Sequence, residues 1–236
     1  MDVPVEGVLR GFVRRIRIVP AARVTYRRWP DGEAELIARV EGGAAMVTAI
    51  GPHGGPLVKP STHADEVVLV RFRIAGAYPF LGPMGAYANG IVALPEPLAI
   101  GGGDPARAIS RALASRLATA CDPAAAAAVR RCVRRIATLP RVPTVRALAD
   151  DVGASERALR RAFAEVVGLS PKLLLRITRF RRALAAARAP RRAEWAAIAA
   201  GAGYYDQAHL IDEFRALTGL TPGALVAPDD VGSSDR

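Results

Sequence analysis

Three arginines, Arg157, Arg160 and Arg161, occur at spacings that bring them to one side of a helix. At about 100° per residue, the opposite side of that helix is apolar and can pack. An arginine guanidinium suits both the edge of a guanine and a phosphate. The arrangement therefore favours DNA contact, with an ordinary solvated helix face as the alternative. The apolar stripe consists of Leu159, Ala162, Phe163 and Val166.

Local signals predict the elements that hold these arginines. Thr144 is suited to cap a helix over 145–152, Gly153 to make a turn, and Ser155 to cap a second helix that ends near Val167. Helix, glycine turn and helix in this order predict a helix-turn-helix. The glycine turn favours DNA contact over a merely solvated face.

The same pattern recurs at offsets of 50 to 51 residues, which predicts two helix-turn-helix units. Each unit ends in a Ser/Thr-Pro sequence that can start a further helix. The recurring landmarks are Ala149, Gly153, Phe163 and 168–171 in the first unit, and Ala199, Gly203, Phe214 and 219–222 in the second.

The second unit differs chemically from the first. The side of its second helix that faces away from the core carries Ala208, Asp212 and Arg215. An aspartate can accept a hydrogen bond from cytosine N4, but it also repels phosphates. We therefore expect a weaker contact with DNA here. The packing stripe consists of Leu210, Phe214 and Leu217.

A single helix over 171–189 is predicted between the two units. Its length of about 27 Å approaches the repeat of about 34 Å of B-DNA, so one chain could reach two successive major grooves. Lys172, in its first turn, could bind a phosphate or be a solvated cation. The expected buried stripe is Leu173, Ile177, Phe180, Leu184 and Ala187, and the expected exposed residues include Arg176, Arg179 and Arg182.

Residues 144–222 resemble the DNA-binding domain of AraC/XylS-type transcription regulators, through LADDVGASERALRRAFAEVVGLSPK and IAAGAGYYDQAHLIDEFRALTGLTP. The resemblance covers about a third of the chain. It implies a seven-helix domain with two helix-turn-helix units joined by a long helix. It also implies promoter binding and activation of transcription through contact with RNA polymerase.

Carried over by position, the resemblance places base-reading residues at Arg157, Arg160 and Arg161, and at Ala208 and Asp212 in the second unit. Many relatives carry arginine at the position of Asp212, which puts base reading there in doubt. Gln207 falls where relatives often approach the DNA backbone. The complete predicted DNA-binding set is Thr144, Ser155, Arg157, Arg160, Arg161, Lys172, Arg176, Arg179, Gln207, Ala208, Asp212 and Arg215.

The first hundred residues have a different texture, with short β-rich runs separated by Gly and Pro. They predict a small antiparallel sheet or barrel, with strands over 24–26, 36–38, 45–50 and 67–72 and turns at 30–32 and 51–52. Residues 24–100 also resemble an uncharacterised domain that precedes this module in some bacterial regulators, through WPDGEAELI and VRFRIAGAYPFLG. Its pattern of short β-rich runs is similar to that of a half-barrel sensor.

The predicted fold class is α+β with two domains and a helical connector. Two helices are expected in the connector, over 105–120 and 123–139, with Asp104 and Asp122 as their respective caps. Pro140 and Pro143 then mark a boundary. The predicted divisions are a β-rich sensor or dimerisation domain at 1–100, the connector at 101–140, the double helix-turn-helix at 141–227 and a disordered tail at 228–236.

Composition agrees with a folded chain that has a polyanionic partner. The chain is 51% hydrophobic and carries 33 basic against 22 acidic residues, a net charge of +11. Arginine supplies all but two of the basic residues, so the excess can also reflect a GC-rich genome. No apolar run reaches the roughly 20 residues of a membrane span, and the start lacks the features of a secretion signal. A cytoplasmic, nucleoid-associated protein is expected.

Other polar residues could form chemical sites, but each has a simpler interpretation. His53 and His63 lack a third metal ligand, so surface histidines are favoured. Asp31, Glu33 and Glu35 could act as acid and base, but a turn leading into a solvated strand edge explains them equally. Two inert thiols are expected at Cys121 and Cys132. We place no catalytic residue, no metal and no cofactor.

The aromatic residues Tyr78, Phe80 and Tyr87 could line a small-molecule pocket, although ordinary core aromatics are favoured. The leading hypothesis is a bacterial one-component transcription regulator, and not an enzyme. Its expected partners are double-stranded promoter DNA, RNA polymerase, a small-molecule effector and a second copy of the chain. The alternatives are a DNA-associated enzyme, such as an alkyl-accepting repair regulator, and an architectural DNA binder without a ligand. The first hundred residues contain no Cys to accept an alkyl group.

Overall fold

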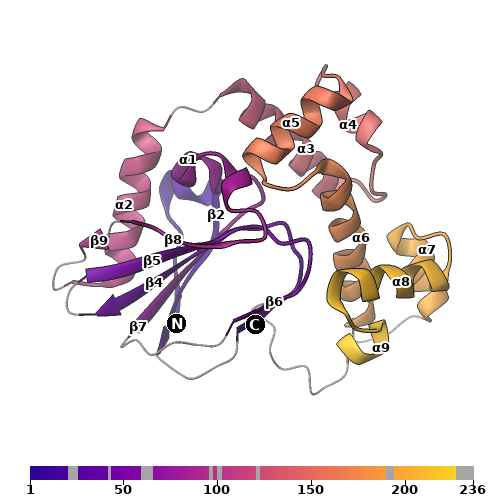
Figure 1. Ribbon diagram of the computed structural model, residues 1–236, viewed down its shortest axis with the longest axis horizontal. Coiled ribbons are helices and arrows are strands. Elements are labelled where there is room, and N and C mark those ends of the chain that lie inside the picture. The colour runs from indigo at the N-terminus through magenta and orange to yellow at the C-terminus, as the bar shows by residue number, and fades with distance from the viewer. Residues whose placement is uncertain are drawn as a thin grey trace.

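The computed structural model shows a β-rich amino-terminal unit and a helical carboxyl-terminal unit (Figure 1). It describes residues 1–20, 26–41, 44–59, 66–95, 98–99, 103–120, 123–189 and 194–226. The predicted α+β fold class is therefore confirmed. The expected strand over 24–26 is described only from Tyr26, and the expected tail at 228–236 lies outside the described residues.

A seven-stranded antiparallel sheet forms the amino-terminal unit, in the order β1-β2-β7-β4-β5-β8 with β9 beside β5. A second sheet pairs β3 (Tyr26–Arg28) with β6 (Leu57–Lys59). The strands of the large sheet are β1 (Asp2–Val3), β2 (Val13–Pro20), β4 (Glu35–Glu41), β5 (Ala44–Ile50), β7 (Glu66–Phe72), β8 (Ile91–Ala93) and β9 (Leu98–Ala99).

The helix α2 (Pro105–Thr119) lies against the sheet and shares its core. Val68, Val70 and Phe72 alternate toward this core in the central strand β7, as a half-buried strand requires. Ile109 and Leu113 of α2 are buried against them. Three short elements complete the unit: η1 (Gly7–Gly11), α1 (Tyr78–Leu81) and η2 (Met84–Ala86).

The helical unit packs around three buried phenylalanines, Phe163, Phe180 and Phe214. The rings of Phe180 and Phe214 meet edge to face, with 4.8 Å between their centroids. Its helices are α3 (Ala124–Thr138), α4 (Val145–Asp151), α5 (Glu156–Val166), α6 (Pro171–Ala187), α7 (Trp195–Ala202), α8 (Gln207–Thr218) and α9 (Pro222–Leu225).

The predicted capping residues begin the helices as expected. The side chains of Thr144, Ser155 and Ser170 accept hydrogen bonds from backbone amides at the starts of α4, α5 and α6. Thr221 does the same for α9, and Asp206, where no cap was predicted, does so for α8. Each such bond satisfies an amide that has no partner within its helix, so these short side chains fix where the helices begin.

The connector helices differ in part from the prediction. Asp104 caps α2 as expected, but Pro123 holds the N-cap position of α3, without a side-chain bond, and Asp122 lies outside the described residues. The helix expected over 171–189 ends at Ala187. The helices also belong to different cores, because α2 packs on the sheet whereas α3 packs against α5.

The two units meet closely at the end of α5 and the start of α6. The hydroxyl of Tyr78 donates to Glu165 Oε1 at 3.1 Å across this boundary. Gly32 has a φ of +75°, and a Cβ there would lie 2.6 Å from the Leu174 side chain. Gly168 has a φ of +80°, and a Cβ there would lie 2.7 Å from the Met84 carbonyl oxygen. Both positions need glycine, so the contact between the units constrains the sequence on each side.

Candidate DNA-binding surface

The first helix-turn-helix consists of α4, a glycine turn and α5. Gly153 has a φ of +66°, and the amide of Ala154 donates to the Ala149 carbonyl at 3.0 Å, which closes the turn. On α5, Leu159, Phe163 and Val166 are buried, so the opposite side of the helix is directed outward. The predicted helix-turn-helix is present with its turn and its packing stripe.

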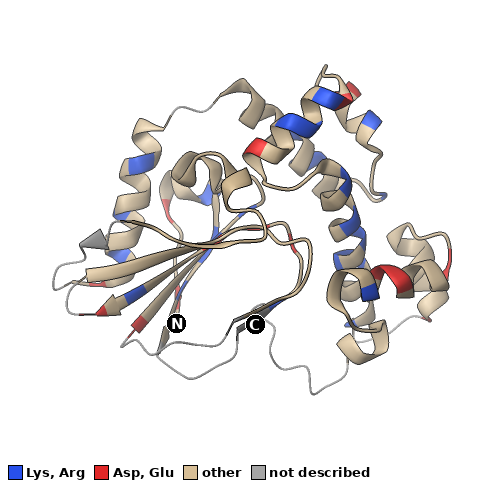
Figure 2. Cartoon of the chain, viewed as in Figure 1, with Lys and Arg blue, Asp and Glu red and all other residues tan. Residues whose placement is uncertain are grey.

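The arginines of α5 lie on that outward side. Arg157, Arg160 and Arg161 are all exposed, and Figure 2 shows basic residues along α5. Arg160 pairs with Glu156 one turn earlier, with 2.6 Å between Nη2 and Oε2. Within the described part of the chain, the side chains of Arg157 and Arg161 form no hydrogen bond or ion pair. Their guanidinium groups are thus available to an external partner.

The second helix-turn-helix consists of α7, a turn at Gly203 with a φ of +84°, and α8. The side chain of Asp206 accepts from the His209 amide at 2.8 Å to start α8. The expected packing stripe of Leu210, Phe214 and Leu217 is buried. The predicted surface residues Gln207, Ala208, Asp212 and Arg215 are exposed, as expected.

Tyr205 is a surface residue that the sequence analysis did not single out. It lies in the turn before α8 with 93% of its surface exposed. Neighbouring Tyr204 is buried, and burial raises the pKa of its phenol. No periodic pattern in the sequence separates the two adjacent tyrosines, because the turn is irregular.

The two second helices are alike in packing and opposite in charge. With Phe163 aligned to Phe214, the exposed arginines of α5 correspond to Ala208, Ile211 and Asp212 of α8. The fold thus places an outward-facing helix in both units, but positive side chains occupy the compared positions only on α5.

The arginines of α6 are not the exposed row that the helical pattern predicted, because Arg176, Arg179 and Arg182 are all half-buried. Arg176 donates twice to Glu213 of α8, with both bonds 2.9 Å long, and this hydrogen bonding raises the pKa of Arg176. The guanidinium of Arg179 lies 6.0 Å from the centre of the Tyr204 ring. These arginines hold neighbouring elements in place.

Arg182 is engaged at the end of α3. Its Nη2 donates to the carbonyl oxygens of Ile136 and Leu139, both at 2.8 Å, and its Nη1 donates to Pro140 at 2.9 Å. Ile136 lies in the last turn of α3, and Leu139 and Pro140 directly follow the helix, so Arg182 supplies donors where the helix itself has none. Lys172, by contrast, is exposed in the first turn of α6, as predicted.

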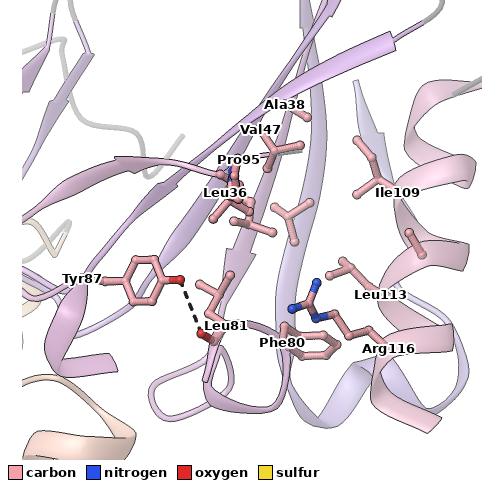
Figure 3. Close-up of a pocket in the computed structure, with 13 residues that line it drawn as sticks. Leu36, Ala38, Val47, Phe80, Leu81, Tyr87, Pro95, Ile109, Leu113 and Arg116 are labelled. Atoms are coloured by element: carbon pink, nitrogen blue, oxygen red, sulfur yellow. Dashed lines mark hydrogen bonds between the residues drawn. The ribbon is translucent and has the colours of Figure 1, made fainter. Parts of the chain in front are cut away.

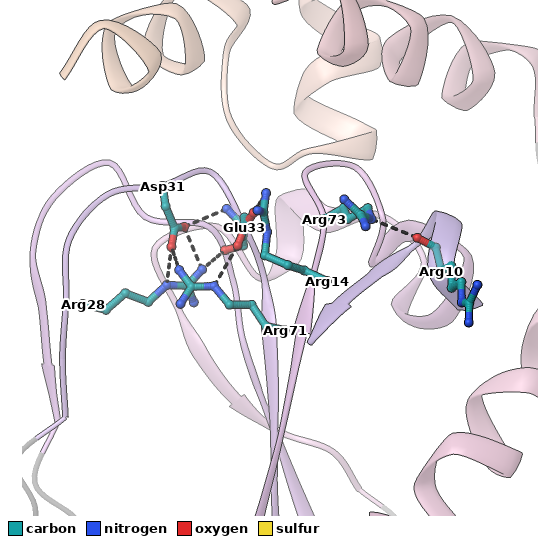
Figure 4. A network of polar contacts seen from close by, with 7 residues as sticks. All are labelled: Arg10, Arg14, Arg28, Asp31, Glu33, Arg71 and Arg73. Atoms are coloured by element: carbon teal, nitrogen blue, oxygen red, sulfur yellow. Dashed lines mark hydrogen bonds and ion pairs between the residues drawn. The ribbon is translucent and has the colours of Figure 1, made fainter. Parts of the chain in front are cut away.

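The acidic residues expected at a solvated strand edge are instead buried, and that expectation is wrong. Asp31, Glu33 and Glu35 are 4%, 1% and 3% exposed. Arg28 donates to Asp31 at 2.7 and 3.0 Å, and Arg71 donates to Glu33 at 2.7 Å and also to Asp31 (Figure 4). Burial by itself raises the pKa of Asp31. The positive charges of Arg28 and Arg71 together outweigh this effect and lower the pKa to about 2. The network is a paired set of charges inside the protein.

His53 is also buried, which corrects the expected surface position. Burial lowers the pKa of its imidazole, and the positive charge of Arg28 adds to this, so that the pKa falls to about 4. Its suggested metal partner His63 lies outside the described residues. Among the residues that are described, no three His, Cys, Asp or Glu side chains gather closely enough to hold a metal ion.

An apolar pocket of about 420 Å³ lies between the sheet and α2 (Figure 3). Phe80 and Tyr87 line it, as the pocket hypothesis proposed, whereas Tyr78 instead contacts Glu165 at the boundary between the units. The remaining lining is aliphatic apart from Arg116. The pocket could hold an apolar compound with an acidic group near Arg116.

Cys132 is buried in α3, and burial raises the pKa of its thiol, which disfavours the reactive thiolate. Cys121 lies outside the described residues. No helix in the described ranges has both the length and the apolar character that a membrane span requires.

A family model described as "Helix-turn-helix domain" matches residues 148–227. A comparison with curated proteins gives no match. Among solved structures, an AraC-type transcriptional regulator from Chromobacterium violaceum has 23% identity and a TM-score of 0.38, over 43% of this chain and 94% of that chain. ToxT from Vibrio cholerae has 8% identity and a TM-score of 0.43, over 89% of this chain and 93% of its own.

ToxT bound to an unsaturated fatty acid has 8% identity and a TM-score of 0.41, over 91% of this chain and 90% of its own. The family match covers both turns and both second helices, α5 and α8, but not the β-rich unit. The carboxyl-terminal third of this chain is therefore a helix-turn-helix domain.

Proposed function

We propose that this protein is a sequence-specific DNA-binding transcription regulator that inserts α5 and α8 into successive major grooves. The observation that carries the proposal is the outward arginine face of α5, with Arg157 and Arg161 exposed and not engaged by any described residue. A helix held from behind by apolar packing presents these forks in a fixed orientation, as base reading requires.

The spacing of the two units fits this proposal. The 17 residues of α6 span about 26 Å, close to the helical repeat of about 34 Å in B-DNA. Arg176 ties α8 to α6 through Glu213, so the second unit is fixed relative to the long helix. One chain would therefore present both second helices to the same side of a duplex.

The two units would contribute differently. On α5, Arg157, Arg160 and Arg161 would read bases. On α8, Asp212 would repel phosphates and weaken the contact, while Gln207 and Arg215 would contact the DNA backbone. Thr144, Ser155 and Lys172 lie at helix starts, where backbone amides favour a phosphate. Arg176 and Arg179 would act indirectly, through their contacts to α8 and Tyr204.

Regulation would come from the β-rich unit. We assign residues 1–100 to sensing or dimerisation and residues 141–227 to DNA binding, with activation through RNA polymerase as the family resemblance implies. The effector would be an apolar compound with an acidic group, held in the pocket of about 420 Å³ beside Arg116. A thermal shift of the full chain with medium-chain carboxylic acids, weakened by Arg116→Gln, tests this assignment.

The test of DNA binding is a selection of bound fragments from random genomic DNA with the full chain, followed by footprinting. We expect an asymmetric site with two half-elements about one helical turn apart. A palindromic site would instead indicate a dimer with one unit engaged per half-site. The absence of any protected duplex in dilute buffer would refute DNA binding altogether.

A matched pair of double variants assigns the contact to α5. Replacing Arg157 and Arg161 by alanine should abolish selection, whereas replacing the exposed Arg107 and Arg111 of α2 should not, although both pairs remove the same charge. Equal losses would mean that the net charge, and not α5, carries binding.

The alternative of an architectural binder predicts a shallow preference among sequences. A regulator should bind its site about 10³-fold or more tightly than random DNA. The alternative of an enzyme has less support, because Cys132 is buried in the helical core and the first hundred residues contain no Cys.

A further inference from the structure

A second cavity, of about 610 Å³, lies between the two units, where η1 and the residues after β7 face α3 and α6. Six arginines line it, and they come from both sides of the boundary. Arg14 and Arg73 belong to the β-rich unit, and Arg130, Arg134, Arg181 and Arg182 belong to the helical unit. We call this cavity the arginine cleft.

The positive charge of the arginine cleft is poorly balanced by its own lining. Asp31 is its one lining carboxylate, and Asp31 is already paired with Arg28 and Arg71 in the buried network. Like charges that share a concave space raise the free energy of the empty cleft and favour an anion within it. The cleft is therefore electrostatically prepared for a ligand with several negative charges.

Not all six arginines are equally available. Arg182 donates to three carbonyls near the end of α3, and Arg73 donates to the Arg10 carbonyl at 2.9 Å. Arg14 pairs with Glu33 but keeps 47% of its side chain exposed. Arg130 lies over the Phe12 ring, whereas the side chains of Arg134 and Arg181 make no hydrogen bond or ion pair to any described residue. These two, from α3 and α6, are the free forks of the cleft.

The rest of the lining is largely apolar. Ile74 comes from the β-rich unit, Val133 from α3, and Leu174 and Ile177 from α6. A small inorganic anion would leave this surface without a partner. A volume of about 610 Å³ lies in the range of sites for small organic ligands and cofactors. The expected ligand thus combines a flat or apolar body with a cluster of anionic oxygens.

We propose that the arginine cleft binds a nucleoside polyphosphate, with its phosphates held by Arg134 and Arg181 and its base over the apolar residues. Guanidinium forks match phosphate oxygens in pairs, and they also stack on planar rings. A duplex is disfavoured as the occupant because the space lies between the two units and its volume of about 610 Å³ is that of a small-molecule site. The proposal goes beyond the proposed function, since it assigns a ligand to the boundary between the units.

Such a ligand would affect the DNA-binding domain. It would join the β-rich unit to α3 and α6, and the opposite side of α6 holds α8 through the pair of Arg176 and Glu213. Binding at the cleft would therefore favour one position of α6 relative to the sheet. The effect on DNA affinity would follow from that preference.

The experiment uses the full chain without DNA and measures heats of binding and thermal unfolding. ATP and GTP are the probes, with adenosine, guanosine and inorganic tripolyphosphate as separate arms. We expect a nucleoside triphosphate to bind with a Kd in the micromolar range and to raise Tm. The nucleosides and tripolyphosphate should each bind about tenfold or more weakly, because each offers half of the contacts.

Two double variants locate the site. Replacing Arg134 and Arg181 by glutamine should weaken nucleotide binding by about tenfold or more. Replacing Arg131 of α3 and Arg188, which directly follows α6, should leave nucleotide binding nearly unchanged, because both are exposed and lie outside the cleft. The single variant Arg134→Gln, at an exposed position, should give part of the loss without affecting the fold.

Several results would overturn the proposal. The first is that neither triphosphate binds, and the second is that the two double variants have equal affinity for the nucleotide. The third is that tripolyphosphate binds as tightly as the nucleotide. The fourth is that a DNA duplex displaces the nucleotide from a variant that lacks Arg157 and Arg161. The α5 variant should otherwise bind nucleotide normally, so a failure of DNA binding and a failure of this proposal are distinguishable.

Discussion

Two sets of arginines, one in each unit of this protein, have opposite surroundings. In the β-rich unit, Arg28 and Arg71 are 2% and 7% exposed and bind the carboxylates of Asp31 and Glu33. In the helical unit, Arg157 and Arg161 of α5 are exposed and have no described partner. The residue type is the same, but the desolvation of its charge differs greatly.

This difference separates stability from recognition. A buried charge is tolerated only with a partner, so removal of one member of the network leaves the others unbalanced. An exposed arginine is solvated with or without a partner, so its removal affects mainly the ligand. Substitutions in the network should therefore change the free energy of unfolding, and substitutions on α5 should change DNA affinity.

The largest effect is expected for Asp31→Asn. Asparagine keeps the shape but removes the charge that balances Arg28 and Arg71, so the free energy of unfolding should fall by about 3 to 5 kcal/mol. Urea unfolding at neutral pH measures this loss. The matched change Asp151→Asn removes a carboxylate 3.1 Å from Arg135, where both side chains are exposed, and should cost less than about 1 kcal/mol. Equal costs would mean that the buried network contributes little.

The next effect is a dependence of stability on pH that comes from His53. Its pKa is about 4 in the folded protein against 6.5 for the unperturbed group, so the unfolded chain takes up a proton first as the pH falls. The stability is fully present above pH 6.5 and is lost progressively toward pH 4, by about 2 to 3 kcal/mol. Asp31 acts in the same direction at lower pH, between 3.8 and about 2.

Urea titrations at a series of pH values measure this dependence. His53→Gln cannot take up the proton, so it should flatten the curve between pH 6.5 and 4 while leaving the steeper loss at lower pH. An unchanged slope in that range would assign the proton uptake to other groups.

The sequence predicted the exposed set of charges far better than the buried set. The turn at Gly153 and the caps Thr144 and Ser155 are local signals, because each acts within four residues of its own position. The stripe of Leu159 and Phe163 then determines which side of α5 faces outward. The candidate DNA surface could thus be derived from one short segment.

The buried network depends on contacts between distant residues. Asp31 and Arg71 are 40 positions apart, and Arg176 and Glu213 are 37 apart, so no periodic pattern relates them. A helical wheel treats Arg176 as exposed because it contains no information about α8. The arginine cleft could not be predicted for the same reason, since the packing of the two units creates it.

Among the exposed arginines of α5, Arg161→Ala should weaken binding to the best operator by about 1 to 3 kcal/mol if this arginine donates two hydrogen bonds to a guanine. The free energy of unfolding should barely change, because the side chain is exposed. Titrations on the selected operator and on random DNA provide the measurement. Equal losses on both would show that Arg161 contacts only phosphate.

The second unit offers the reverse test through Asp212→Arg. This change removes a charge that repels phosphate and places an arginine where α5 has Arg161. Binding should tighten, and the slope of log affinity against log salt should increase by about one unit. An ionic-strength titration measures both effects. An unchanged slope would remove position 212 from the interface.

The smallest effect is expected for Glu156→Gln. The carboxylate of Glu156 pairs with Arg160 at 2.6 Å, so this arginine must leave its partner before it can contact DNA. Exposed pairs of this kind contribute about 0.3 to 0.5 kcal/mol, so their loss should tighten operator binding by about twofold. Asp150→Asn, an exposed carboxylate on α4, removes the same charge without releasing an α5 arginine. Equal tightening in both variants would attribute the gain to net charge alone, whereas a gain confined to Glu156→Gln would show that Arg160 is held back by its own helix.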